Sequence, residues 1–274
     1  QAKTLPRYDY WHQPPKGARI LVLTEQGQGD TVQFARYLPW LLLHRHAEHI
    51  TLEPPDALLD LLTGAFQGEP RMTVRARSKA VPTDVDGWCL LLSLPAILRE
   101  AKMHHVPPPI RPFGLQWQRP VVHTGRVFVH SRGNAGHGYD FDRSAPPNLL
   151  EDAVRATGAE VITAGFDRTA QATDGATVIA DPSWRDTVDA LLTCDRCLTV
   201  DTGLAHVAGS LGIPTDLCVP TMPEWRWGKP DATVTPWYPS ARLWRRTRTD
   251  RWMECVRQIT ESWETQPELS EVGL

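Results

Sequence analysis

The sequence predicts an α/β protein of two domains, each built on a parallel β-sheet that helices cover. Short apolar runs typical of buried strands alternate along the chain with segments of helical periodicity. A proline-rich stretch interrupts this alternation, and 274 residues is long for a single core. We therefore expect a first domain at residues 1–110, a linker at 111–125 and a second domain at 126–274. The last helix is a candidate to pack back on the first domain.

The first domain begins with the apolar run RILVLT at residues 19–24, which has the composition of a buried parallel strand. A glycine-rich turn follows, and apolar residues at helical spacing then predict a helix over 30–44. Further strands are expected at 49–53, 71–77 and 88–92, and helices at about 55–63 and 94–102.

The second domain repeats this alternation after the prolines of the linker. A strand at 127–130, a helix at 147–157 that Gly158 ends, and a strand at 160–163 come first. A helix at 184–193, a strand that ends at Val200, a helix at 203–211 and a strand at 215–219 follow. Strands that alternate with helices favour a parallel sheet here too.

Composition limits the classes of function. With 41% hydrophobic and 22% charged residues the chain can bury a core, and its formal charge of −3 gives no overall attraction to nucleic acid. Five arginines between 242 and 251 form either a local polyanion patch or an ordinary solvated surface. No apolar run approaches the roughly 18 residues of a membrane span, so none is expected.

The five cysteines lie among apolar neighbours, which indicates buried thiols in a reducing compartment and predicts a cytoplasmic protein. Cys194 and Cys197 have the spacing of metal ligands, but no second pair completes a zinc set, so no metal is expected. The chain begins at Gln1 rather than at methionine, which leaves a lost leader or an upstream domain open.

The sequence VDTGLAH at 200–206 places polar residues where a predicted strand ends and a helix begins. In open α/β sheets, ligands bind at the carboxyl ends of the strands, where Asp201 lies. Thr202 is a suitable N-cap, and the N–H groups of the next three residues, Gly203 to Ala205, with the helix dipole would hold a diphosphate. His206 is expected to point away from the apolar face of this helix. The alternative is an ordinary capped helix with a surface histidine.

The turn EQGQGD at 25–30 occupies the equivalent place in the first domain. Asp30 at a predicted helix start is either a general base or a simple N-cap. A dinucleotide fold would require GxGxxG, and Val32 stands where the third glycine should be, which argues against an NAD site.

Five ordered motifs resemble a known family: EQGQGDTVQFARYLP (25–39), LLSLP (91–95), VDTGLAH (200–206), PEWRW (223–227) and PWYPS (236–240). They resemble the glycosyltransferase module often found behind tetratricopeptide repeats, which is similar to the heptosyltransferases of glycosyltransferase family 9. The resemblance extends over residues 5–259. It implies the GT-B fold, in which two Rossmann-like domains face a cleft, and an inverting transfer of a sugar from a nucleoside-diphosphate sugar, without a metal or other cofactor.

The resemblance also assigns roles to residues. Asp30 matches the proposed catalytic base. The donor diphosphate would be held by Asp201, Thr202, Gly203, Leu204, His206 and Arg143. The nucleotide or the sugar would contact Ser131, Arg132, Gly133, Asn134, Trp184, Glu224 and Trp225. The acceptor side would include Gln26, Gly27, Gly29 and Gln33.

Alternatives remain at this stage. Asp140 and Asp142 spell the DxD pattern that binds manganese in the other major glycosyltransferase fold, but two acids at this spacing are common by chance. A non-catalytic nucleotide-sugar-binding protein and, with less support, an NAD-binding oxidoreductase are the rival functions. The acceptor is open among a glycan, a lipid-linked sugar, a protein and modified nucleic acid, and the arginines of 242–251 hint at an anionic one.

Overall fold

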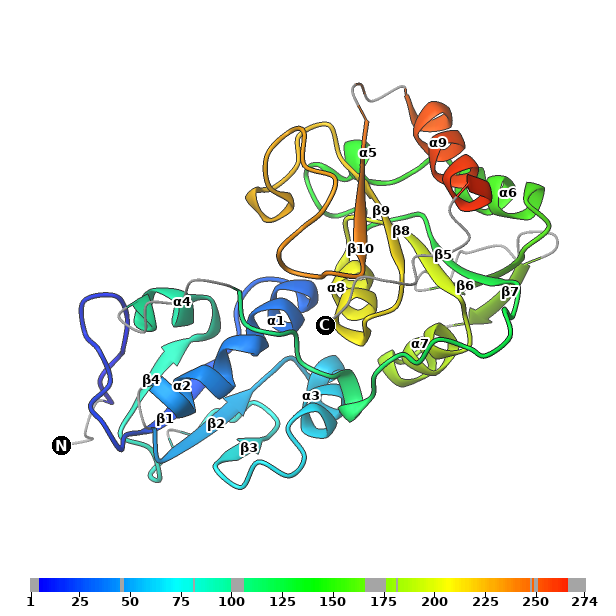
Figure 1. Ribbon diagram of the computed structural model, residues 1–274. Helices are drawn as coiled ribbons and strands as arrows, with labels where there is room; N and C mark the ends of the chain where they lie inside the picture. Colours follow the sequence, from blue (N-terminus) through cyan, green and yellow to red (C-terminus); the bar gives the residue numbers. More distant parts are fainter. Residues whose placement is uncertain are drawn as a thin grey trace. The chain divides into compact units, whose positions relative to one another are not determined.

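The computed structural model describes residues 5–265 except 45–46, 81, 100–105, 166–175, 181, 247 and 249–250. The chain divides into two compact units, Gln1–Leu115 and Gln116–Leu274, and each contains one parallel sheet (Figure 1). Within the described residues, no helix has both the length and the apolar character needed to cross a membrane.

The sheet of the first unit has four parallel strands in the order β3-β2-β1-β4. The strands are β1 (Arg19–Leu23), β2 (His49–Glu53), β3 (Met72–Val74) and β4 (Gly87–Leu90). The helices are α1 (Gln28–Phe34), α2 (Leu38–His44), α3 (Leu59–Ala65) and α4 (Leu94–Ile97). The helix predicted over 30–44 is therefore two helices, joined by the 3₁₀ turn Ala35–Tyr37. Pro39 lacks the N–H that would bond to the Ala35 carbonyl oxygen in a continuous α-helix.

A short extended segment before β1 lies along the outer edge of β4. Arg7 forms a parallel bridge with Trp88, the Tyr8 N–H donates to the Trp88 carbonyl oxygen at 2.7 Å, and the Trp88 N–H donates to the Pro6 carbonyl oxygen at 3.0 Å. The Tyr8 ring lies so close to Gly87 that an added Cβ there would be 2.6 Å from it. This segment extends the sheet beyond β4.

The start of the predicted linker is packed structure. The 3₁₀ turn Pro112–Gly114 lies on α3, where an added Cβ on Gly64 would be 2.7 Å from the Cα of Phe113. Pro112 is buried. The expectation of a linker over all of 111–125 is therefore wrong for its first residues, because a glycine on α3 lets the proline-rich chain pack against the helix.

The sheet of the second unit has six parallel strands in the order β10-β9-β8-β5-β6-β7. The strands are β5 (Arg126–His130), β6 (Glu160–Gly165), β7 (Ala176–Ala180), β8 (Arg196–Val200), β9 (Thr215–Val219) and β10 (Ala241–Arg245). The two strands that the sequence did not predict are the edge strands β7 and β10. On the outer side of β10, Val234 forms an antiparallel bridge with Arg242. Arginines interrupt the apolar residues of β10, so it lacks the continuous apolar run of a central parallel strand.

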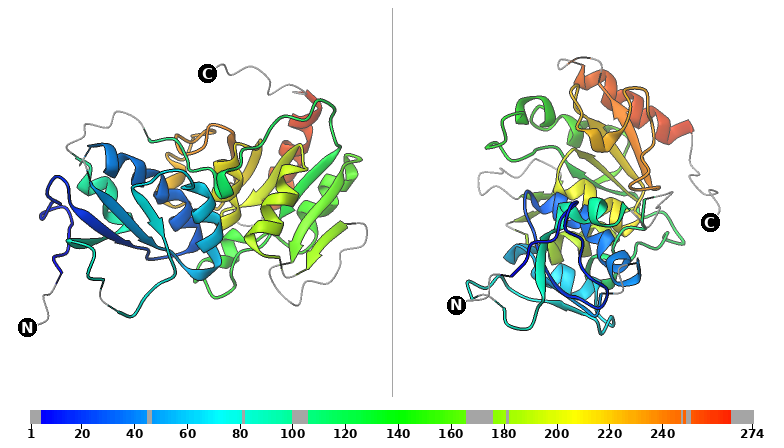
Figure 2. Two further views of the ribbon diagram at one scale, coloured as in Figure 1. Left: turned by 90° about the horizontal axis from the view of Figure 1, so that it is seen from below. Right: turned by 90° about the vertical axis from the view of Figure 1, so that its left-hand side faces the viewer.

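The helices of the second unit lie in two layers (Figures 1 and 2). They are α5 (Asp140–Arg143), α6 (Leu149–Ala156), α7 (Trp184–Leu192), α8 (Gly203–Leu211) and α9 (Trp252–Thr265). Helices α6 and α9 contact each other, as do α7 and α8. The apolar side of α9, with Trp252, Val256 and Ile259, is buried in a core with residues of β5, β8 and β9. This side of α9 therefore belongs to the core of the second unit.

Candidate functional site

Strand order locates the candidate site in each unit. Counted from β5, the first strand of the second sheet, the order is 3-2-1-4-5-6, which is the order of a Rossmann fold. The chain reverses direction across the sheet between β5 and β8, and open α/β sheets bind ligands beside the carboxyl ends of the strands at this switch point. The loops there begin at Ser131, after β5, and at Asp201, after β8. In the first unit the equivalent point lies between β1 and β4.

The N-terminus of α8 begins at this switch point of the second unit. Thr202 is the N-cap, with an extended backbone at φ −141° and ψ 177°. Its hydroxyl does not cap the helix; among the described residues, Thr202 Oγ1 is buried and has no hydrogen-bond partner. The Ala205 N–H, the third of the donors that the sequence predicted, already donates to the Thr202 carbonyl oxygen at 3.1 Å, which leaves two donors for a ligand. The N–H groups of Gly203 and Leu204 remain without an intrahelical acceptor.

The loop after β5 places Arg143 at the same point. Arg143 lies on α5, and its guanidinium pairs with Asp140 at 3.1 Å. The Asp140 carboxylate also accepts the Ser144 hydroxyl at 2.9 Å, and the Ser144 hydroxyl oxygen accepts the Gly133 N–H at 2.7 Å. An added Cβ on Gly133 would lie 2.3 Å from Asp140 Oδ1 and 2.5 Å from Arg143 Nη2. Gly133 therefore allows the Arg143–Asp140 pair to rest on the loop backbone.

Two residues near the end of β5, His130 and Glu151, were not predicted as site residues, whereas Ser131 was. His130 is the last residue of the strand, and burial, with the nearby Arg143 guanidinium, lowers its pKa to about 4. The Ser131 hydroxyl donates to Glu151 on α6 at 2.7 Å, and both residues are buried. The expectation that Ser131 contacts the donor is therefore not met, because its side chain faces the helix behind the loop. A histidine at the carboxyl end of a strand was a signal that could have singled out His130.

Asp142 connects the loops that follow β5 and β9. Its carboxylate accepts the Thr221 hydroxyl at 2.8 Å and the Met222 N–H at 3.2 Å, and pairs with Arg246 at 3.0 Å. Asp142 and Arg246 are both buried. Since both carboxylate oxygens already have partners, the DxD pattern of the sequence here forms a structural ion pair.

The segment between β9 and β10, residues 220–240, carries the PEWRW motif. Glu224 begins the 3₁₀ turn Trp225–Trp227 and forms an ion pair with Arg226. Trp225 is 63% exposed, whereas Trp227 is 1% exposed. An exposed tryptophan beside a buried one is a flat apolar surface available to a ligand.

His206 does not point to solvent. It is 5% exposed, its Nδ1 shares a hydrogen bond of 2.9 Å with the Tyr238 hydroxyl, and its ring stacks on Trp227. The segment 220–240 covers the side of α8 that carries His206, so the alternative of a surface histidine is wrong. Helical periodicity describes one helix and cannot show what packs on its second face.

The other predicted donor residues are less closely associated with the switch point. Arg132 and Asn134 are exposed on the loop after β5, where Asn134 Oδ1 accepts the Gly136 N–H at 2.9 Å. Trp184 is half-buried at the start of α7, which follows the edge strand β7, two strands from β5.

The basic stretch 242–251 is not a uniform solvated patch. Arg242 stacks on Trp244 at 4.2 Å, Arg245 donates to the carbonyl oxygens of Ala232 and Trp227, and Arg246 is buried in the ion pair with Asp142. Most of these arginines form part of β10 and its contacts, so the stretch gives little support to a polyanion surface.

In the first unit, Asp30 lies at the switch point but is not the N-cap of α1. Gly27 is the N-cap, and Asp30, three residues later, accepts the Gly27 N–H at 3.0 Å. Gln26, the residue before, is exposed with a left-handed backbone at φ 63°, an uncommon conformation for a side chain other than glycine. Asp30 is half-buried, so its carboxylate remains accessible at the helix start.

A second acid lies beside Asp30 and was not predicted. Glu25 accepts the N–H groups of Leu91 and Leu92 at 3.1 and 3.0 Å, which connects the loop after β1 to the loop after β4. Burial raises the pKa of Glu25, and the nearby negative charge of Asp30 raises it further.

The remaining residues predicted for the acceptor side differ in exposure. Gly27 is exposed, and Gly29 is half-buried within the first turn of α1. Gln33 is completely buried, so it does not face an acceptor as expected. It lies on the side of α1 that is covered by protein.

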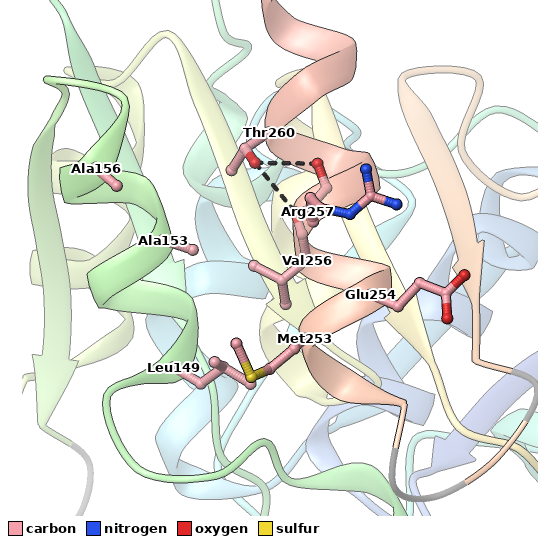
Figure 3. Close-up of a pocket in the computed structure, with 8 residues that line it drawn as sticks. All are labelled: Leu149, Ala153, Ala156, Met253, Glu254, Val256, Arg257 and Thr260. Atoms are coloured by element: carbon pink, nitrogen blue, oxygen red, sulfur yellow. Dashed lines mark hydrogen bonds between the residues drawn. The ribbon is translucent and has the colours of Figure 1, made fainter.

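A groove of about 380 Å³ lies elsewhere, between α6 and α9 (Figure 3). Leu149 and Met253 approach each other across it, and the Thr260 hydroxyl is bonded to carbonyl oxygens of its own helix. This groove lies in a helix layer on the face of the sheet and contains none of the predicted site residues.

Comparison with known proteins gives matches among solved structures only. No protein-family model and no curated protein sequence matches this chain. One similar structure is TibC of enterotoxigenic E. coli H10407, an iron-containing dodecameric heptosyltransferase solved with ADP-D-β-D-heptose. The comparison of this chain with that complex gives a TM-score of 0.60 and 17% identity, over 90% of this chain and 74% of TibC.

Two further solved structures, both of glycosyltransferases, are also similar to this chain. The glycosyl transferase family 9 protein from Veillonella parvula DSM 2008 has a TM-score of 0.58 and 11% identity, over 91% of this chain and 97% of its own. E. coli heptosyltransferase WaaC with ADP-2-deoxy-2-fluoro heptose has a TM-score of 0.56 and 12% identity, over 89% of this chain and 99% of WaaC. The chain has the fold of these glycosyltransferases.

This similarity confirms the fold class that the sequence predicted, two Rossmann-like units of the GT-B type. TibC is described as iron-containing. In the part of this chain that the structure describes, no group of three or more His, Cys, Asp or Glu side chains could hold a metal ion.

Proposed function

We propose that this protein is a glycosyltransferase that moves a sugar from a nucleoside-diphosphate sugar to an acceptor hydroxyl. One observation supports this most directly. The switch point of the second unit combines a glycine-bearing loop, the cation Arg143 and the free N-terminus of α8, in a fold that proteins with bound ADP-sugars share. These are the groups that bind a diphosphate without a metal.

The donor diphosphate would lie between Arg143 and the N–H groups of Gly203 and Leu204, with Thr202 Oγ1 as a further hydrogen-bonding group. When the bond between the sugar and the diphosphate breaks, negative charge develops on the leaving group. The helix N-terminus and the guanidinium would stabilise that charge, and because they are fixed beforehand they need little reorganisation. Arg143 would exchange part of its pairing with Asp140 for the diphosphate.

Asp30 would act as the general base. Its carboxylate takes the proton of the acceptor hydroxyl while the hydroxyl oxygen attacks the anomeric carbon from the side opposite to the leaving group, which inverts the configuration. Its contact with the Gly27 N–H holds the carboxylate at the start of α1. The exposed Gln26 and Gly27 would line the acceptor side.

The first test is the binding of nucleoside diphosphates, measured as a rise in melting temperature with UDP, ADP, GDP, CDP and TDP, each with manganese or with EDTA. A ligand at 100 times its dissociation constant adds about 2.7 kcal/mol to the free energy of unfolding. We expect one diphosphate to stabilise the protein equally under both conditions. Stabilisation by none of them, or only with manganese, would contradict the proposed donor site.

The second test is turnover. Hydrolysis of the matching nucleotide sugar, followed as nucleoside-diphosphate release, should fall by about 10² to 10⁴-fold in Asp30→Asn. Binding of the nucleoside diphosphate should be unchanged, because the proposed diphosphate contacts come from Arg143 and the N-terminus of α8. The control is Asp60→Asn, an exposed acid on α3. Equal rates for wild type and Asp30→Asn would contradict the role of Asp30 as general base. No turnover in the wild type, with binding retained, would indicate a non-catalytic nucleotide-sugar-binding protein.

A further inference from the structure

The surroundings of His206 connect α8 to the segment 220–240. The Tyr238 hydroxyl shares the 2.9 Å hydrogen bond with His206 Nδ1, and the Tyr238 ring meets the imidazole edge on at 5.7 Å. Trp227 stacks on the same imidazole, with ring centroids 5.5 Å apart and planes 22° apart. Both aromatic residues come from the segment 220–240, so His206 is the point where this segment is attached to the helix.

The helix is shaped to receive Tyr238. Gly209 follows His206 by about one helical turn, and an added Cβ there would lie 2.4 Å from Tyr238 Cγ. The Tyr238 ring therefore packs directly on the helix backbone, and Tyr238 is completely buried. A glycine in the middle of a helix destabilises the helix relative to alanine, and the packing of the ring offsets this loss.

The segment 220–240 also lies at the donor edge of the sheet. It begins after the carboxyl end of β9, next to β8, and Thr221 and Met222 are bonded to Asp142 of the loop after β5. Glu224 and Trp225 follow within the segment, and Trp225 and the buried Trp227 belong to the same 3₁₀ turn. Whatever fixes Trp227 therefore also fixes Glu224 and Trp225.

We propose that His206 is a positioning residue. It attaches the segment 220–240 to α8 so that Glu224 and Trp225 form one wall of the donor site, and it does not touch the donor itself. This rests on the proposed function for the identity of the ligand. Because the segment is ordered before binding, the donor does not have to order it, and this raises affinity. Loss of the attachment should then raise the donor KM and leave kcat nearly unchanged.

Hydrogen exchange tests the attachment without any ligand. Tyr238→Phe removes the hydroxyl, and His206→Phe keeps a ring against Trp227 but removes Nδ1. The N–H groups of Trp227 and Gly228 form hydrogen bonds within the segment, and in each variant they should exchange with solvent at least about 10-fold faster than in the wild type. In the double variant their exchange should be little faster than in either single variant, because both substitutions break the same hydrogen bond.

The control for this experiment is Thr215→Val. It removes another buried hydroxyl, whose hydrogen bond goes to the Ile213 carbonyl oxygen at the start of β9. We expect no faster exchange in the segment for this variant. Unchanged exchange in Tyr238→Phe and His206→Phe, or an equal increase throughout the second unit, would overturn the proposal.

Donor binding gives the second measurement. With the diphosphate that stabilises the wild type, we expect Tyr238→Phe and His206→Phe to weaken binding about 3- to 10-fold and to raise the donor KM alike, with kcat within about twofold. Weaker binding with unchanged exchange in the segment would mean that His206 contacts the donor, which overturns the proposal. If the wild type binds no diphosphate, the proposed function fails, and the exchange result still decides whether His206 fixes the segment.

Discussion

Glu25 accepts the backbone N–H of Leu92 at 3.0 Å, with its other carboxylate oxygen on the N–H of Leu91 at 3.1 Å. These two hydrogen bonds fix the loops on both sides of the first switch point to each other. Burial, and to a smaller degree the charge of Asp30, raises the pKa of Glu25 above its ordinary value of 4.5. The carboxylate thus carries a desolvation cost that the two N–H groups partly offset.

Glu25→Gln should lower the free energy of unfolding by about 1 to 3 kcal/mol, because the amide NH₂ would face one of the two N–H groups. A carboxyl group with a raised pKa in the folded state stabilises most below its unfolded pKa and loses this contribution as the pH rises through the folded pKa. The difference in the free energy of unfolding between wild type and variant, measured by urea unfolding, should therefore shrink from pH 4 to pH 8. A difference that grows with pH would contradict this, and Glu48→Gln, at an exposed site, serves as the control.

Gly133→Ala should weaken nucleoside-diphosphate binding with little loss of stability. The new Cβ would meet the side-chain ends of Asp140 and Arg143, which can move, but only by taking Arg143 away from the switch point. Gly138→Ala is the matched control on the same loop, because a Cβ there meets nothing within 4 Å. Calorimetric titration and thermal unfolding of both variants measure the two effects. Equal affinity in both variants would argue against a role for Arg143 in binding.

His130 should make the protein less stable in acid. The pKa of His130, about 4, lies below the ordinary value of 6.5. The neutral imidazole therefore contributes to the free energy of unfolding above pH 6.5, and this contribution is lost as the pH falls toward 4. Between pH 7 and pH 4.5, the free energy of unfolding should fall less steeply in His130→Asn than in the wild type. Only the slopes are compared, so a constant loss of stability in the variant does not matter. Identical slopes would show that His130 is not held neutral by its surroundings.

Asp142→Asn should lower the free energy of unfolding by about 3 to 5 kcal/mol, because it removes the counter-charge of the buried Arg246 guanidinium. Asp152→Asn, at a partly exposed pair with Arg155, should cost no more than about 1 kcal/mol. Urea unfolding of the two variants measures this contrast. Similar small losses would mean that the buried pair is replaceable by a neutral hydrogen bond.

The sequence predicted the parts of the fold that depend on local patterns. Apolar runs located the central strands, and the residues around Thr202 and Asp30 were expected at strand ends because parallel strands end at one edge. Features that depend on packing between distant segments were not predicted. Three such contacts join residues far apart in sequence: the bond of His206 with Tyr238, the bond from Ser131 to Glu151 and the pairing of Asp142 with Arg246.

Two of these misses have a common cause. Arg246 lies in an arginine-rich stretch and Asp142 in an acidic pair, and the sequence left a polyanion surface open for one and a manganese site, as a chance pattern, for the other. Neither alternative anticipated a buried ion pair, in which each charge has the other as its partner. Glu25 was missed because its partners are backbone N–H groups, which no side-chain motif records.

The short extended segment on the outer edge of β4 has a practical consequence. An uncovered edge strand offers its free N–H and C=O groups to any other chain, which is a common route to aggregation. Here Pro6 and Tyr8 occupy those groups of Trp88. A shortened protein that starts at β1 would keep every strand of the first sheet and yet expose this edge. Such a truncation should aggregate during expression, so designs for production should retain the residues from Pro6 onward.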